Sequence, residues 1–160
     1  MTIQVGDRIP DGKLMRMTAD GPAPITTEEL FSGKKVVLFA LPGAFTPTCS
    51  AKHLPGFVRN AEAIKAKDVD TIACLSVNDA FVMAAWGENQ QVDGKVLMLA
   101  DGNGEFSRAL GLEFDASGFG MGLRSQRYAM IVENGVVTAL SVEAPGAFEV
   151  SSAEAVLEQL

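Results

Sequence analysis

One segment, Val36 to Gly56, restricts the fold of this chain more than any other. It opens with an apolar run, Val36 to Leu41, whose length is typical of one buried strand. A Pro-Gly pair ends the run. The Thr-Pro-Thr sequence at residues 46–48 then predicts a helix start, because proline in the first helical turn lacks only an N–H group that would be unpaired anyway. The sequence therefore predicts a strand, a turn and a helix whose first turn contains Cys49.

The position of Cys49 favours a reactive thiol. The first turn of a helix offers unpaired backbone N–H groups and the positive end of the helix dipole, and both stabilise a thiolate. The alternative is a buried cysteine that behaves as a small hydrophobic residue. The neighbouring residues are polar, which favours the reactive alternative: Thr46, Thr48, Ser50 and Lys52. We therefore predict that Cys49 is a nucleophile.

Pro42, Thr46 and Cys49 form the pattern P-x-x-x-T-x-x-C. The longer string LPGAFTPTCSAKHLPGF resembles the active-site segment of peroxiredoxins of the AhpC/TSA family, in the branch that contains peroxiredoxin five and the plant type II enzymes. The resemblance extends over CLSVNDAFVMAAWG and RSQRYAMIVENG, residues 74–87 and 124–135. It implies a thioredoxin-like fold and a peroxidase that needs no cofactor. The implied substrates are hydrogen peroxide and alkyl hydroperoxides, which Cys49 reduces through a sulfenic acid.

Attack of a thiolate on a peroxide requires donors that hold both oxygens and a charge that stabilises the leaving oxyanion. The Thr46 hydroxyl, one helical turn before Cys49, is predicted to donate to a peroxide oxygen, and Pro42 to shield the thiolate from water. The resemblance adds Arg127, which the family places beside the thiolate, where its charge would stabilise the transition state. Without the family, Arg127 would be expected to be solvated, and Arg124 keeps that expectation.

Two further substrate-binding candidates are His53 and Phe119. His53 follows Cys49 by four residues, so a Cys-His dyad for acyl transfer is conceivable. No third residue that would orient this histidine is identifiable, and we expect His53 to line the mouth of the pocket or to face water. The function classes that compete with a peroxidase are a thiol redox sensor or binding module on the same fold, and a Cys-His hydrolase.

The cysteine count bears on how a sulfenic acid at Cys49 would be reduced. Cys74 lies in an apolar strand pattern and is predicted to be a buried structural thiol. Some members of the branch carry a resolving cysteine in the segment corresponding to residues 146–152, but GAFEVSS contains none. We therefore expect a one-cysteine mechanism that is recycled by glutathione and glutaredoxin, with thioredoxin as the alternative reductant.

Composition limits the remaining possibilities. The 160 residues, 48% of them hydrophobic, predict one domain over residues 1–160. A net charge of −7 argues against binding nucleic acid or an anionic membrane, and a single histidine argues against a zinc site. No secretory signal is visible, and no apolar stretch approaches the roughly 20 residues that span a bilayer, so we expect a cytoplasmic protein. The resemblance also implies a non-covalent homodimer, paired through loops that contain Phe45, Phe81 and Phe119.

Strand and helix patterns alternate along the chain, which predicts an α/β fold with a mixed central sheet and helices on both faces. Residues 13–17 are predicted as an edge strand and residues 70–77 as a strand buried on both faces. A T-x-x-E capping box at Thr26 predicts a short helix. The helix after Cys49 is predicted to kink or break at the Pro-Gly pair 55–56.

The C-terminal third is predicted to contain a hairpin and a last helix. Residues 113–123 are rich in glycine and are predicted as a loop. The Asn134-Gly135 pair predicts a tight β-hairpin between strands at residues 127–132 and 136–142. Ser151 is predicted to cap the final amphipathic helix.

Overall fold

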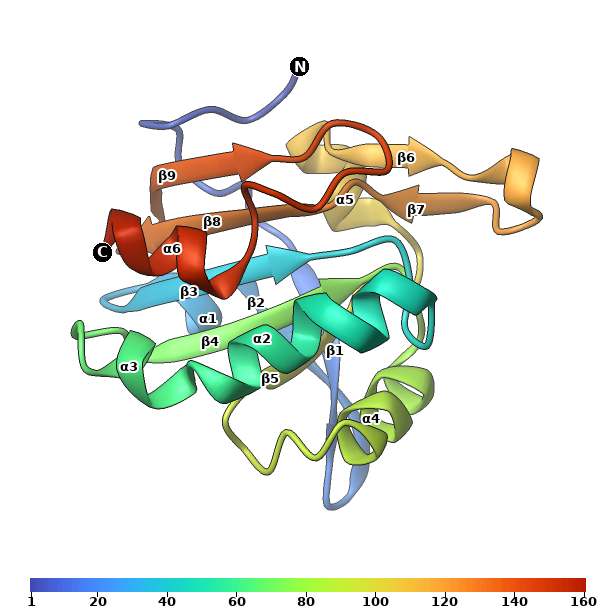
Figure 1. Cartoon of the computed structure of the whole chain (residues 1–160), viewed down its shortest axis with the longest axis horizontal. Coiled ribbons are helices and arrows are strands. Elements are labelled where there is room, and N and C mark those ends of the chain that lie inside the picture. The colour runs from blue at the N-terminus through green and yellow to red at the C-terminus, as the bar shows by residue number, and fades with distance from the viewer.

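The computed structural model describes residues 1–160 and has a seven-stranded mixed sheet at its centre (Figure 1). The strands lie in the order β2-β1-β5-β4-β3-β8-β9. Their bounds are β1 Lys13–Thr18, β2 Gly21–Thr26, β3 Lys35–Ala40, β4 Thr71–Ser76, β5 Leu97–Ala100, β8 Tyr128–Glu133 and β9 Val136–Val142. A separate two-stranded sheet pairs β6 Glu113–Asp115 with β7 Leu123–Ser125. The helices are α1 Thr27–Phe31, α2 Leu54–Arg59, α3 Ala61–Lys65, α4 Ala80–Asn89, α5 Glu105–Leu110 and α6 Ala153–Gln159.

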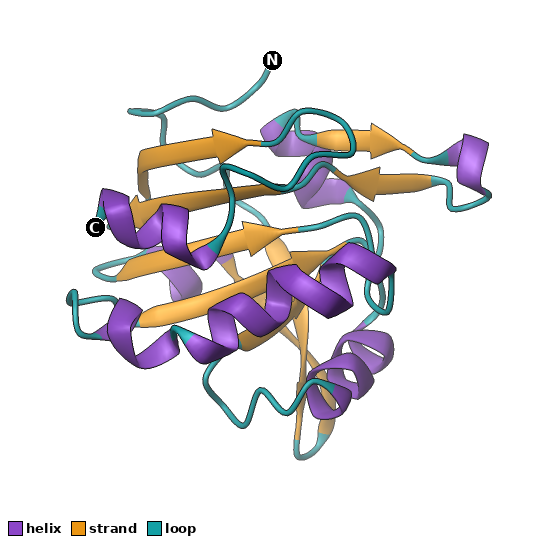
Figure 2. Ribbon diagram, in the orientation of Figure 1, coloured by secondary structure: helices purple, strands orange, loops and turns teal.

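Helices lie on both faces of the sheet (Figure 2). In this view α2, α3 and α6 are in front of the strands, and α1 is behind them. The predicted fold class is confirmed: a thioredoxin-like α/β fold with a mixed sheet, helices on both faces, and a C-terminal hairpin followed by a helix. None of the helices has the length and apolar character that crossing a bilayer requires.

Strand β3 lies inside the sheet and carries the predicted apolar run. It pairs in parallel with β4 and antiparallel with β8. Successive side chains of a strand point to opposite faces, so Val37 and Phe39 join one hydrophobic core while Val36 and Leu38 join the other. Because both faces are buried, the strand reads as a continuous apolar run. Its carboxyl end leads directly into the segment that contains Cys49.

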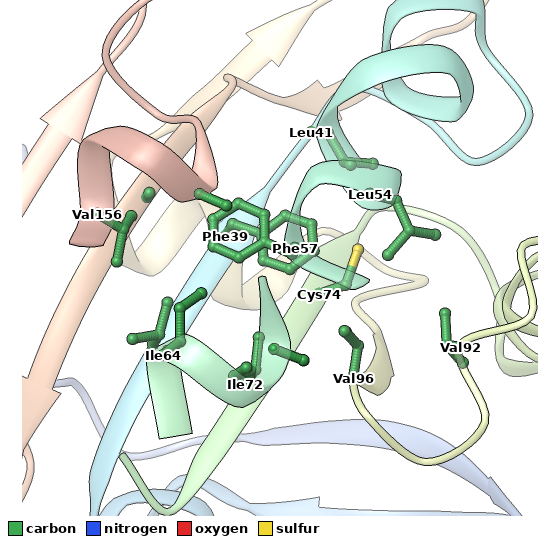
Figure 3. Close-up of a cluster of buried hydrophobic side chains, with 14 of the residues drawn as sticks. Phe39, Leu41, Leu54, Phe57, Ile64, Ile72, Cys74, Val92, Val96 and Val156 are labelled. Atoms are coloured by element: carbon green, nitrogen blue, oxygen red, sulfur yellow. The ribbon is translucent and has the colours of Figure 1, made fainter. Parts of the chain in front are cut away.

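One of the two cores lies under the helices that position the site (Figure 3). Phe39 of β3 stacks on Phe57 of α2, with ring centroids 3.9 Å apart and planes 4° from parallel. Cys74 of β4 and Val156 of α6 belong to the same core. This packing fixes α2 on the sheet, and with it the helical turn that begins at Cys49.

Two local signals are confirmed. The Thr26 side chain accepts from the backbone N–H of Glu29, and the Glu29 carboxylate accepts from the backbone N–H of Thr26, so the capping box is complete. Asn134 and Gly135 join β8 to β9 with φ angles of 49° and 79°. A two-residue hairpin turn of this kind needs positive φ at both positions, which explains the Asn-Gly pair.

The strand predicted at residues 13–17 is present as β1, but the prediction that it lies at the edge of the sheet is wrong. Strand β1 pairs with β2 on one side and with β5 on the other, so it is internal. The edge is β2, which the sequence analysis missed because its sequence GPAPIT contains two prolines. Proline donates no ladder hydrogen bond and is therefore tolerated mainly in edge strands.

Two other expectations need correction. Residues 113–123 are not only a loop, because they contain β6, a 3₁₀ turn at Ser117–Phe119 and the start of β7. The final helix is capped by Ser152, whose side chain accepts from the N–H of Ala155, and not by Ser151. The Ser151 hydroxyl donates instead to the Glu143 carboxylate at 2.7 Å.

Candidate active site

The chain around Cys49 forms a π-helical turn, Cys49–His53, in which the N–H of Leu54 donates to the carbonyl of Cys49. This turn runs directly into α2, whose first turn contains Pro55. The helical turns continue through Pro55, so the predicted break does not occur there. The discontinuity comes later, at Asn60, between α2 and α3.

Arg127 links the two other polar side chains of the site. Its Nη2 donates to Cys49 Sγ at 3.2 Å, and its Nη1 lies 2.9 Å from His53 Nδ1. Arg127 directly precedes β8, and Tyr128 of β8 pairs with Ala40 at the end of β3. This register brings the arginine to the strand end from which the Cys49 segment leaves. The Cys49 side chain is fully buried beneath it.

His53 is buried and neutral, so the expectation that it faces water or lines the pocket mouth is wrong. Its Nε2 lies 3.0 Å from the carbonyl oxygen of Ser151. A carbonyl can only accept, so Nε2 carries the proton and Nδ1 accepts from Arg127. Burial, followed by the charge of Arg127, lowers the pKa of His53 to about 3, against an opposing effect of the Ser151 hydrogen bond and of Glu143.

The hydrogen bonds of His53 also bear on the Cys-His hydrolase alternative. A general base must reach the thiol proton directly or through one water molecule. Both ring nitrogens of His53 are occupied, one by Arg127 and the other by the Ser151 carbonyl. The group that contacts Cys49 Sγ is the guanidinium, which cannot accept a proton. The geometry therefore provides a positive charge for a thiolate and no base for acyl transfer.

The Thr46 hydroxyl donates to the carbonyl of Gly43 at 2.7 Å. Its proton is therefore engaged, and the expected donation from Thr46 to a peroxide oxygen is not what this geometry offers. The lone pairs of the same oxygen can accept a hydrogen bond from a hydroperoxide O–H.

A cavity of about 390 Å³ lies beside Arg127, and neither Cys49 nor Thr46 belongs to its lining. Pro42, Thr48 and Arg127 form part of its lining, together with residues of β6 and of the loop that follows β9. Neither His53 nor Phe119, the two further candidates for substrate binding, lines this cavity. Phe119 is 77% exposed in the 3₁₀ turn between β6 and β7, and its role as a substrate contact stays a prediction.

Arg124 is a site residue that sequence reasoning missed. Instead of being solvated, its Nη1 donates to the carbonyls of Val77 at 3.2 Å and Pro42 at 3.5 Å, and its Nε donates to Met121 at 3.0 Å. It therefore ties the turn after β3 to the end of β4. A side chain at Gly43 would meet this guanidinium, since a Cβ there would lie 3.2 Å from Arg124 Nη1.

Two more side chains hold the Cys49 segment in place. Asn78, at the end of β4, accepts from the backbone N–H of Ala44 at 3.0 Å and from the Ser76 hydroxyl at 2.6 Å. The buried Trp86 of α4 donates from its indole nitrogen to the Ser50 hydroxyl at 3.0 Å. Buried tryptophans usually find such a partner, but nothing in the sequence indicates which hydroxyl it is.

Known proteins resemble the chain along almost all of its length. The Redoxin family matches residues 4–157. Peroxiredoxin-2E-2, chloroplastic, from Oryza sativa is 55% identical over 99% of this chain and 73% of its own length. Peroxiredoxin-2B from Arabidopsis thaliana is 48% identical over 99% of this chain and 98% of its own length. The crystal structure of reduced Prx3 from Vibrio vulnificus in complex with hydrogen peroxide superposes with a TM-score of 0.95, at 59% identity and 99% coverage of both chains.

The buried, neutral His53 predicts how stability depends on pH. Its pKa is about 3 in the folded chain and near 6.5 when unfolded, so the unfolded chain binds the extra proton between these values. The free energy of unfolding should carry this contribution in full above pH 6.5 and lose about 1.4 kcal/mol per pH unit below it.

His53→Gln supplies the matched comparison, because glutamine keeps a donor and an acceptor but does not titrate. Urea denaturation of both proteins between pH 7 and pH 5 measures the two slopes. The variant should lose stability less steeply as the pH falls. Parallel slopes would show that His53 is not held neutral.

Proposed function

We propose a mechanism for this chain on the premise that it belongs to the Redoxin family and is a peroxiredoxin, an enzyme that reduces peroxides with electrons from thiols. The Cys49 thiolate attacks the distal oxygen of hydrogen peroxide or of an alkyl hydroperoxide. An S–O bond forms as the O–O bond breaks, and the leaving oxyanion takes a proton to become water or an alcohol. Cys49 is left as a sulfenic acid.

The observation that carries this proposal is the 3.2 Å hydrogen bond from Arg127 to Cys49 Sγ. A cation at that distance stays in place to stabilise the negative charge as it moves from the attacking sulfur to the leaving oxygen. The Thr46 oxygen accepts from the hydroperoxide O–H and so holds the peroxide in line. Pro42, in the lining of the cavity, keeps water from the thiolate.

The sulfenic acid must then react with a second thiol, and the structure supports an external one. Cys74 is fully buried in the core under α2 (Figure 3). Burial, followed by the nearby Cys49, raises the pKa of the Cys74 thiol, so it is a poor nucleophile at neutral pH. It also pairs with Phe39 in the centre of the sheet, and leaving that position would break ladder hydrogen bonds and core packing.

We infer that glutathione takes the role of this external thiol. Its sulfur attacks the sulfur of the sulfenic acid. The hydroxyl group leaves as water, taking up the glutathione thiol proton, and a mixed disulfide remains on Cys49. A glutaredoxin then removes the glutathione by thiolate exchange and regenerates the Cys49 thiol. Thioredoxin is the alternative donor at this second step.

The proposed homodimer rests on exposed aromatic side chains. Phe45, Phe81 and Phe119 are 53%, 65% and 77% exposed. Phe81 lies in α4 and not in a loop as expected, while Phe45 is in the turn before Cys49 and Phe119 in the turn between β6 and β7. Large apolar side chains on a surface are typical of contact sites between proteins.

The cytoplasmic location stays a prediction. Peroxiredoxin-2E-2 from rice is described as chloroplastic, and Peroxiredoxin-2B from Arabidopsis thaliana is not, although both are similar to this chain.

The first prediction from this mechanism concerns turnover of hydrogen peroxide. Cys49→Ser should abolish it, because serine has no accessible anion at neutral pH. Arg127→Ala should slow it by about 10²-fold, the size of losing one donor to a developing oxyanion. The turnover rate of Arg127→Lys should lie between those of the parent protein and Arg127→Ala. Lysine keeps the charge but cannot donate to Cys49 Sγ and to His53 in the planar geometry of a guanidinium. Steady-state peroxide consumption with a generic thiol measures all three, and turnover by Cys49→Ser would refute the mechanism.

The second prediction concerns the reductant. With glutathione and glutaredoxin, Cys74→Ser should keep almost full activity, since the core thiol takes no part. After one equivalent of peroxide plus glutathione, mass spectrometry should find glutathione on Cys49. Accumulation of a Cys49–Cys74 disulfide, with loss of turnover in Cys74→Ser, would make Cys74 the resolving residue. Faster recycling by thioredoxin would favour the alternative donor.

The third prediction concerns assembly. Sedimentation of the reduced protein at micromolar concentration should show a dimer, and Phe81→Glu should shift it towards monomer by placing a charge in the contact. Glu88→Gln in the same helix, a change at an exposed polar position, serves as the control. A strictly monomeric parent protein would exclude the proposed contact.

A further inference from the structure

The loop after β9 returns to the active site around one carboxylate, that of Glu143. Its Oε2 accepts from the backbone N–H groups of Glu149 at 2.8 Å, Val150 at 2.9 Å and Ser151 at 2.8 Å, and from the Ser151 hydroxyl at 2.7 Å. Its Oε1 lies 3.0 Å from the N–H of Glu149. Glu143 is only 7% exposed, although it is charged. Such a concentration of donors on one buried carboxylate fixes the loop from residue 144 to residue 151.

The residues that this carboxylate holds are the ones that contact the site. The carbonyl of Ser151 is the acceptor for His53 Nε2 at 3.0 Å. The ring of Phe148 lies 5.0 Å from the His53 ring, and the Arg127 guanidinium carbon is 5.8 Å from the centre of the Phe148 ring. The N–H of Glu143 also donates to the carbonyl of Arg127 at 2.9 Å. The loop therefore packs against His53 and Arg127, the two side chains that lie next to Cys49.

We propose that Glu143 is a positioning residue of the peroxidase site: it holds the Ser151 carbonyl, which orients His53, which orients the Arg127 guanidinium towards Cys49 Sγ. The chain of hydrogen bonds is continuous, and each link depends on the one before it. Without the Ser151 carbonyl, the proton of His53 can move to Nδ1. The ring would then present a donor to Arg127 in place of an acceptor. The proposal rests on the proposed role of Arg127 at Cys49.

The ionisation of Glu143 agrees with this role. Burial raises the pKa of the Glu143 carboxyl, but the hydrogen bonds from Ser151, Glu149 and Val150 outweigh burial and leave the pKa below its usual value. The group is therefore a carboxylate at neutral pH, able to accept from all of these donors.

The sign of the effect separates positioning from simple electrostatics. A negative charge near a thiol disfavours the thiolate. If Glu143 acted only through its charge, its removal would raise the fraction of Cys49 that is thiolate at pH 7. If Glu143 acts by holding the loop, its removal releases Arg127 and lowers that fraction.

Glu143→Gln is the test variant, because glutamine keeps the shape but turns one oxygen into a donor that faces the N–H of Glu149. Glu149→Gln is the matched control: it removes the same charge from the same loop, at an exposed side chain. The thiolate fraction of Cys49 is read from ultraviolet absorbance near neutral pH, in a Cys74→Ser background. Single-turnover oxidation by hydrogen peroxide is followed by fluorescence of Trp86, the one tryptophan, which contacts Ser50 next to Cys49.

We expect Glu143→Gln to lower the thiolate fraction and to slow oxidation about tenfold, comparable to the loss of an outer hydrogen-bond partner at a metal site. Glu149→Gln should leave both unchanged or raise the thiolate fraction slightly. A folded Glu143→Gln protein whose thiolate fraction is unchanged or higher would overturn the proposal.

Two further variants keep the test decisive. If Glu143→Gln does not fold, Ser151→Ala removes a single donor to the same carboxylate, and it should shift both readouts in the same direction by a smaller amount. A folded Ser151→Ala protein with an unchanged thiolate fraction would then overturn the proposal. Ser152→Ala removes the cap of α6 and should lower stability without changing the thiolate fraction. The thiolate fraction is measured without peroxide, so it reports on positioning even if the peroxidase mechanism itself fails.

Discussion

The site depends on one guanidinium group that has two partners at once. Arg127 reaches Cys49 Sγ with one nitrogen and His53 Nδ1 with the other, at 3.2 Å and 2.9 Å. The planar fork makes this geometry rigid, so the position of the positive charge at the sulfur is set by the histidine. Arg127 and Cys49 are 78 residues apart in the chain, and only the antiparallel register of β3 and β8 brings them together. The contact between Arg127 and Cys49 therefore depends on how the strands of the sheet pair.

The helical segment at Cys49 meets two requirements. Cys49 must lie in a first turn, where backbone N–H groups favour a thiolate, and the chain must continue into α2, which packs on the sheet. The π-helical turn between these parts ends directly before the turn that contains Pro55. Single π turns inside helices are frequent at functional sites. Phe57, one turn further, stacks on Phe39 and so fixes the segment to β3.

Local sequence signals predicted the elements of this fold, but they did not predict the contacts between residues far apart in the sequence. The apolar run of β3, the capping box at Thr26 and the Asn134-Gly135 turn are each decided by neighbouring residues, and the structure confirms them. The burial of His53 and the bonds of Arg124 are decided by segments far away in the sequence, and both predictions were wrong. The contact of Arg127 with Cys49 was expected only through family resemblance. The Ser-Ser pair at 151–152 shows the limit within one motif: both serines fit a helix cap, and only the position of Glu143 decides between them.

It matters electrostatically that the second partner of Arg127 is a histidine, His53. A carboxylate in place of His53 would also orient Arg127, but it would neutralise the guanidinium and compete with the thiolate for its charge. A neutral imidazole orients without neutralising, and burial keeps it neutral by lowering its pKa to about 3. The negative charge lies instead on Glu143, whose carboxylate accepts hydrogen bonds from three backbone N–H groups of the loop after β9. The positive charge of Arg127 is thus left unneutralised by His53 and faces the sulfur of Cys49.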